Sequence, residues 1–100
     1  MRLYLAADRS ALEALRDGGS VTLTAFAAAS DEEEDEFAAL TEAADAGAVA
    51  LAVDVDQVDD GDDQTVTLEQ VAALHLDADG SGDLAWFATQ ELDAVLALLR

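Results

Sequence analysis

Negative charge is the property of this chain that most constrains how it can fold. Its 100 residues include 23 acidic side chains, four arginines and no lysine, which gives a formal net charge of -19. Repulsion of that size opposes a compact state unless salt screens it. The screening length falls from about 10 Å at 0.1 M salt to about 3 Å at 1 M. The composition therefore predicts adaptation to a salt-rich cytoplasm, as in an extreme halophile.

The same charge limits what the protein can bind. Nucleic acids and anionic membranes are contacted through basic patches, so direct binding to either is not expected. The sequence contains no cysteine, no signal-peptide pattern and no apolar run long enough to cross a membrane. We therefore expect one cytoplasmic domain over residues 1–100, as a monomer or homodimer, with an unknown protein or small-molecule partner.

Hydrophobic periodicity predicts an α+β domain. Alternation, weak in residues 2–6 and clear in residues 21–26, predicts two strands. Further strands are predicted at residues 48–55, which are expected to be well buried, and at 64–68 and 84–88. Residues 68–77 favour a short helical turn followed by a further strand. Helices are predicted after Ser10, after Ser30 and after Thr89, with stops at Gly18-Gly19 and Gly47. The order, roughly βαβαβββ(β)α, predicts two layers, with three helices on one face of a mixed sheet of five to six strands. The first strand–helix–strand unit allows a parallel or a split strand pair.

The middle helix carries an acidic run at its start. Asp31 to Glu36 place six carboxylates where they meet the positive end of the helix dipole. Phe37, Leu40 and Ala44 follow at i, i+3, i+7 spacing, which predicts the buried face. Capping and solvation explain the run, and docking to a basic partner or imitation of nucleic-acid phosphates is the functional alternative.

The most specific motif is the stretch 77–83, which matches the start of an EF-hand calcium loop. Asp77, Asp79 and Ser81 would give side-chain oxygens, and Asp83 a backbone carbonyl. The twelfth position, which should be a bidentate acid, is an alanine. Weak binding of calcium or another hard cation at these four residues is therefore the alternative function, and a solvated turn is the simpler interpretation. A second aspartate-rich loop, at residues 54–63, predicts at most weak and unselective cation binding.

Trp86 and Phe87 are adjacent in a predicted strand, so they should face opposite sides of the sheet. One is expected in the core and the other at a pocket or partner surface. With Gln90 and Glu91, they form the candidate binding surface.

Enzymatic activity is not favoured. His75 is the only histidine, and the chain has no nucleophile-elbow or phosphate-loop motif. A lone histidine on a strand is more often structural than catalytic. The enzymatic alternative would gain if His75 and Trp86 shared a concave pocket.

Four stretches of the chain are distinctive: MRLYLAA, EEEDEFAALTEAADAG, VAALHLDAD and DLAWFATQELDAVLALL. They resemble an uncharacterised family of small acidic prokaryotic proteins, found mainly in actinobacteria and expected also in haloarchaea. Its members have an MR-[VL]-Y start and a W-[YF]-ATQE segment near the end. This chain differs in being shorter around residues 46–66 and in its DGSG loop, where more varied sequence is expected; that variation counts against a family metal site. The resemblance implies a strand followed by a helix over 84–99 in a cytoplasmic protein, and it implies no activity.

These observations lead to one expectation about function. We expect a non-enzymatic binding or regulatory module without a resident cofactor, using the surface around Trp86. The alternative is a module that binds calcium or another hard cation at the loop of residues 77–83.

Overall fold

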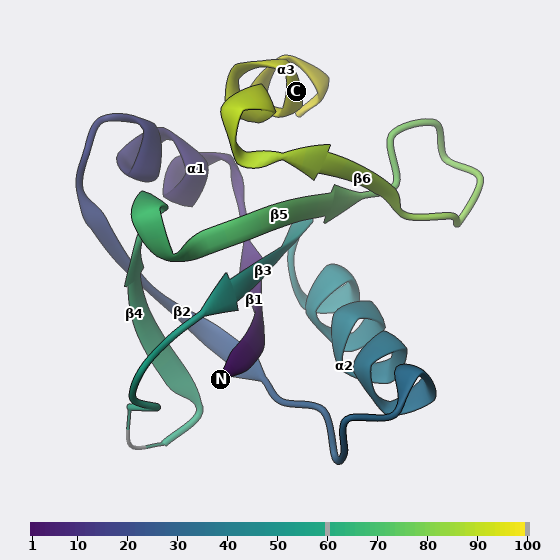
Figure 1. Cartoon of the computed structure of the whole chain (residues 1–100). Coiled ribbons are helices and arrows are strands. Elements are labelled where there is room, and N and C mark those ends of the chain that lie inside the picture. The colour runs from purple at the N-terminus through teal and green to yellow at the C-terminus, as the bar shows by residue number, and fades with distance from the viewer. Residues whose placement is uncertain (60, 100) are drawn as a thin grey trace.

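The computed structural model describes residues 1–59 and 61–99 (Figure 1). Over these residues it forms an α+β domain of six strands and three α-helices, as predicted. The strands are β1 (Arg2–Ala7), β2 (Ser20–Phe26), β3 (Val49–Asp54), β4 (Asp63–Thr67), β5 (Val71–Leu76) and β6 (Ala85–Ala88). The helices are α1 (Arg9–Arg16), α2 (Glu33–Ala46) and α3 (Leu92–Leu98), with 3-10 turns η1 (Leu68–Gln70) and η2 (Thr89–Glu91). None of the described helices is long and apolar enough to cross a membrane.

One open sheet joins the strands in the order β4-β2-β1-β3-β5-β6. Every neighbouring pair is antiparallel, so the prediction of a mixed sheet is wrong. The shortness of α1 gives the reason. Its eight residues extend about 12 Å, whereas the six residues of β1 extend about 20 Å. A crossover that short does not return the chain to the start of β1, so β2 runs back beside β1 in the opposite direction.

The long crossover of the sheet is made by α2. β2 and β3 lie on either side of β1 and both run antiparallel to it, so they are parallel to each other. α2 connects them and packs over β1, β2 and β3 (Figure 1). The split pair that the sequence allowed for the first unit therefore occurs in the second, with β1 between its strands.

Helices cover both faces of the sheet, rather than the single face expected for two layers. On one face, α1 and α3 pack on large aliphatic residues such as Leu5 and Leu51. On the other, α2 places Ala39 and Ala43 against the sheet. The strand residues beneath α2 are Tyr4, Ala50, Ala52 and Ala73. Large and small residues alternate along β3, and successive strand side chains point to opposite faces, which explains the division.

The three described α-helices begin at other residues than predicted. α3 begins at Leu92 rather than directly after Thr89, because Thr89–Glu91 form the 3-10 turn η2. Asp8, rather than Ser10, caps α1, and its carboxylate accepts a hydrogen bond from the backbone N–H of Ala11 at 2.9 Å. A carboxylate serves well there because it also meets the positive end of the helix dipole. α2 begins at Glu33, three residues after Ser30, and the Ser30 hydroxyl donates to the carboxylate of Asp35 in the first turn of the helix.

Other local predictions are confirmed. Gly18 follows α1 with a φ of 90°, and α2 ends at Gly47. Residues 68–76 form the turn η1 and then β5. Gly47 also leaves room for the neighbouring strand, since a Cβ there would lie 2.8 Å from the backbone N and O atoms of Ala7.

Candidate functional site

The predicted surface around Trp86 is divided between the two faces of the sheet. Trp86 pairs with His75 across β5 and β6. Phe87 packs against the aliphatic core, whereas Trp86 is 61% exposed on the side of α2. The two aromatic residues therefore face opposite sides, which confirms that part of the prediction.

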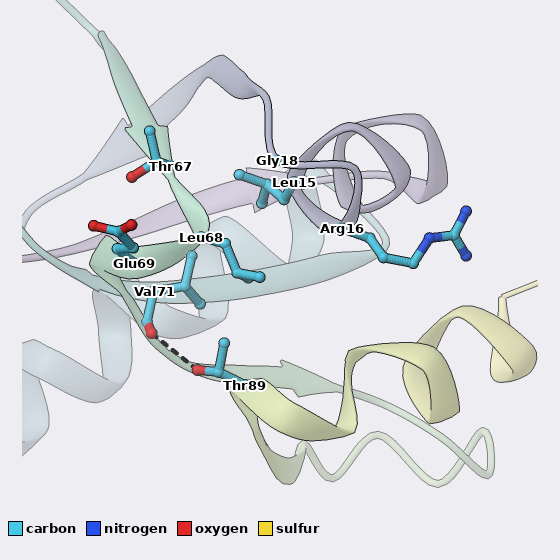
Figure 2. A pocket seen from close by; sticks show the side chains of 8 residues that line it. All are labelled: Leu15, Arg16, Gly18, Thr67, Leu68, Glu69, Val71 and Thr89. Carbon is cyan, nitrogen blue, oxygen red and sulfur yellow. Dashed lines mark hydrogen bonds between the residues drawn. The ribbon is translucent and has the colours of Figure 1, made fainter.

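Gln90 and Glu91 belong to the turn η2 and do not line the cavity that contains the tryptophan. The Glu91 carboxylate accepts a hydrogen bond from the backbone N–H of Ala88 at 3.0 Å. The Thr89 hydroxyl donates to the carbonyl of Val71 at 2.9 Å (Figure 2). These bonds fix the turn from β6 into α3, so Glu91 has a structural role and the four predicted residues do not form one patch.

Trp86 lines a cavity of about 650 Å³ between α2, β5 and β6. The cavity exists because α2 packs over β1, β2 and β3, and the outer hairpin extends beyond it. Its other lining residues come from α2, from β5 and from the loop before β6: Phe37, Leu40, Thr41, Ala44, Asp45, His75, Gly82, Asp83 and Leu84. The wall is therefore mainly apolar, with two carboxylates.

The sequence analysis did not predict that residues of α2 line this cavity. Phe37, Leu40 and Ala44 were predicted to face the core, yet Phe37 is 61% exposed and the other two are half-buried. The buried residues are Ala39 and Ala43, because alanines let the helix approach the alanines of the strands closely. This i, i+4 alanine pair was the signal available in the sequence.

His75 lies on β5 beside Trp86, and both line the cavity. The ring is half-buried, and burial lowers its pKa, as does the positive charge of Arg2. This shared cavity is the arrangement from which the enzymatic alternative was expected to gain. The other ionisable side chains among the described lining residues are Asp45 and Asp83, both exposed.

The loop of residues 77–83 joins two antiparallel strands, so the EF-hand interpretation is wrong. Strand β5, not a helix, enters the loop, and the twelfth position falls within β6. Both oxygens of Asp77 accept backbone hydrogen bonds at 2.8 Å, from Gly80 and from Gly82. The N–H of Ser81 donates to Asp79 at 3.0 Å, and bonds from Ser81 lower the Asp79 pKa.

These bonds make the loop a self-contained turn. The backbone N–H of Asp83 donates to the Ser81 hydroxyl at 3.2 Å, so all three side chains predicted as ligands already accept bonds within the loop. Within residues 1–59 and 61–99, no group of three or more acidic or histidine side chains is placed to hold a metal ion.

Acidic residues of the second loop, 54–63, also contribute to the fold. Asp54 forms a bidentate pair with Arg2 at 2.7 and 3.1 Å, and this bond lowers the Asp54 pKa. The Asp59 carboxylate accepts the backbone N–H of Thr65 at 2.9 Å. Asp60, which was included in the predicted cation loop, lies outside the described residues.

A second cavity, of about 500 Å³, lies where the end of α1 meets η1 and η2 (Figure 2). Leu15, Leu68 and Val71 form its apolar wall. Arg16 extends away from the other labelled side chains in Figure 2 and pairs with Asp93 at 3.7 Å. This cavity lacks an exposed aromatic residue and is the weaker candidate.

No protein family, curated protein or solved structure that was compared with the chain matches it.

Proposed function

We propose that this protein is a non-enzymatic binding module of a salt-rich cytoplasm, and that it binds a basic protein partner at the cavity between α2 and β6. One observation carries the proposal: Trp86 and Phe37, each 61% exposed, line the same cavity. Tryptophan is enriched among the residues that dominate protein interfaces, because its large surface gains much when it is buried.

The sequence lends independent support. Two of the four stretches that carry the family resemblance, 32–47 and 83–99, supply both exposed aromatic residues of this cavity. The formal charge of -19 favours a partner of opposite sign, since charge complementarity steers association and selects partners. Asp45 and Asp83 place part of that charge at the cavity itself.

The proposal is tested with an array of short peptides of varied composition, probed in about 2 M KCl to suppress nonspecific attraction. Wild-type protein should retain a defined set of peptides, and Trp86→Ala should lose that set. Leu98→Ala is the matched control, because Leu98 is 47% exposed on α3 and does not line the cavity. An array that retains no peptide, or that Trp86→Ala leaves unchanged, would overturn the proposal.

The salt adaptation has its own test. The described ion pairs are exposed, so each contributes little to stability, and losing them to screening costs less than relieving the net repulsion of the chain gains. The melting temperature should rise smoothly with KCl up to about 3 M, where the screening length is only a few ångströms. Full stability at low salt would overturn this part of the proposal.

A further inference from the structure

We propose that the group recognised in the cavity is the guanidinium of an arginine side chain carried by the partner, stacked on Trp86 and paired with Asp45 or Asp83. This inference rests on the binding module proposed above and names the chemistry of its partner. It follows from the kinds of side chain that line the cavity and from their places on separate elements.

The cavity combines the two features that bind an organic cation. Trp86 offers an exposed indole, and an aromatic face attracts a cation through its quadrupole. Asp45 comes from α2 and Asp83 from the loop before β6, so the carboxylates approach from different elements. Leu40 and Leu84 provide apolar surface for the aliphatic part of a long side chain.

Residues 1–59 and 61–99 do not fill this site with an arginine of their own. Among the described lining residues, the only basic side chain is His75, and burial lowers its pKa, which favours the neutral ring. The arginines at positions 2, 9 and 16 are paired elsewhere. They contact Asp54, Glu13, Asp17 and Asp93.

Arginine fits this site better than lysine. A guanidinium is planar and weakly hydrated, so it stacks on an aromatic ring and pairs with a carboxylate through two parallel bonds. An ammonium is strongly hydrated and depends more on simple charge attraction, which molar salt screens. The cavity volume of about 650 Å³ lies within the range of about 300–1,000 Å³ that is common for small-ligand sites.

Trp86 is the only tryptophan of the chain, so its indole N–H signal reports on the site directly. We would titrate wild-type protein with the capped tripeptide Gly-Arg-Gly in about 2 M KCl and follow nitrogen–proton NMR spectra. The controls are the same tripeptide with citrulline, which is neutral and nearly isosteric, and with lysine. We expect the arginine peptide to shift the Trp86 signal and to bind at least about fivefold more tightly than either control.

Substitutions of the two aspartates test which carboxylate pairs with the guanidinium. Asp83→Asn and Asp45→Asn should each weaken binding of the arginine peptide, with Asp56→Asn as a control that removes one charge from an exposed position outside the cavity. Equal binding of the citrulline peptide, or no shift of the Trp86 signal, would overturn the inference. If the peptide array shows Trp86-dependent binding without a preference for arginine, the binding module stands and this inference fails. If the array shows no dependence on Trp86, both fail.

Discussion

The two faces of the sheet are built from different residues and are covered to different extents. The face under α1 and α3 carries leucines and valines from all parts of the sheet, and residues such as Leu5 and Leu51 have no exposed surface. The face under α2 carries mainly alanines. There the helix covers β1, β2 and β3, and the hairpin of β5 and β6 keeps a cavity with an exposed tryptophan.

This difference separates stability from recognition. Large aliphatic residues fill the first face and supply most of the hydrophobic stabilisation. The alanines of the second face let α2 approach the sheet closely. A single helix, however, is too narrow to cover the outer strands as well. A side chain on the first face is therefore expected to matter for folding, and one at the cavity for binding.

The largest effect is expected from truncating a leucine of the first face. Leu51 is fully buried, so Leu51→Ala should lower the free energy of unfolding by about 2–5 kcal/mol through lost burial and an internal void. Trp86→Ala removes a larger side chain but an exposed one, and should cost about 1 kcal/mol or less. Urea denaturation in high KCl measures both. Equal losses would contradict the division between the faces.

Overpacking the second face should have the next largest effect. Ala43 lies on α2 and is fully buried against the sheet, so Ala43→Leu should cost about 1–3 kcal/mol by forcing the helix away from the sheet. Ala38→Leu makes the same change at an exposed position of α2 and should alter stability by about 0.5 kcal/mol or less. Thermal melts compare the two variants. Equal melting temperatures for the two variants would contradict close packing of α2 on the alanines of the strands.

The sequence was informative about elements and less so about their arrangement. The alternation in residues 21–26 and turn signals such as Gly18 predicted a strand and a helix end correctly, because those signals are local. Strand direction and the placement of helices on both faces depend on how far α1 and α2 extend relative to the strands. The single-face, mixed-sheet prediction failed for that reason.

The candidate site was also predicted only in part, because local signals were informative and the arrangement of distant elements was not. Period-two alternation was enough to place Trp86 and Phe87 on opposite faces. It could not show that Phe37, far away in the sequence, lies at the same cavity, since a helical stripe of large residues ordinarily predicts the buried face. Here the smaller alanines are buried, and the usual assumption assigned the wrong face of α2.

A smaller effect is expected at the loop beside the cavity. Asp77→Ala removes the acceptor of two backbone bonds and should lower stability by about 1 kcal/mol. Asp56→Ala, which removes the same charge from an exposed position, is the control. Because the loop oxygens are already engaged, melting temperatures in about 1 mM CaCl2 and in MgCl2 should agree for wild-type protein. A rise with calcium alone would restore the cation-binding alternative.

The smallest expected effect comes from His75, which among the described lining residues is the ionisable side chain that is half-buried. Burial and the charge of Arg2 lower its pKa below the ordinary 6.5. The unfolded chain therefore takes up the proton more readily than the folded protein, and protonation favours unfolding. Stability should be independent of this group above pH 6.5 and should fall as the pH drops from 6.5 towards the lower folded pKa.

A matched variant isolates this effect from the many carboxylates, which titrate at lower pH. His75→Gln keeps a polar side chain at the same position and does not titrate in that range. The difference in unfolding free energy between wild type and variant should thus change only between pH 6.5 and the folded pKa. A proton NMR titration of the His75 ring gives the folded pKa directly. A value at or above 6.5 would mean that nearby Asp45 and Asp83 outweigh burial, and that the cavity is more open to charge than its apolar wall suggests.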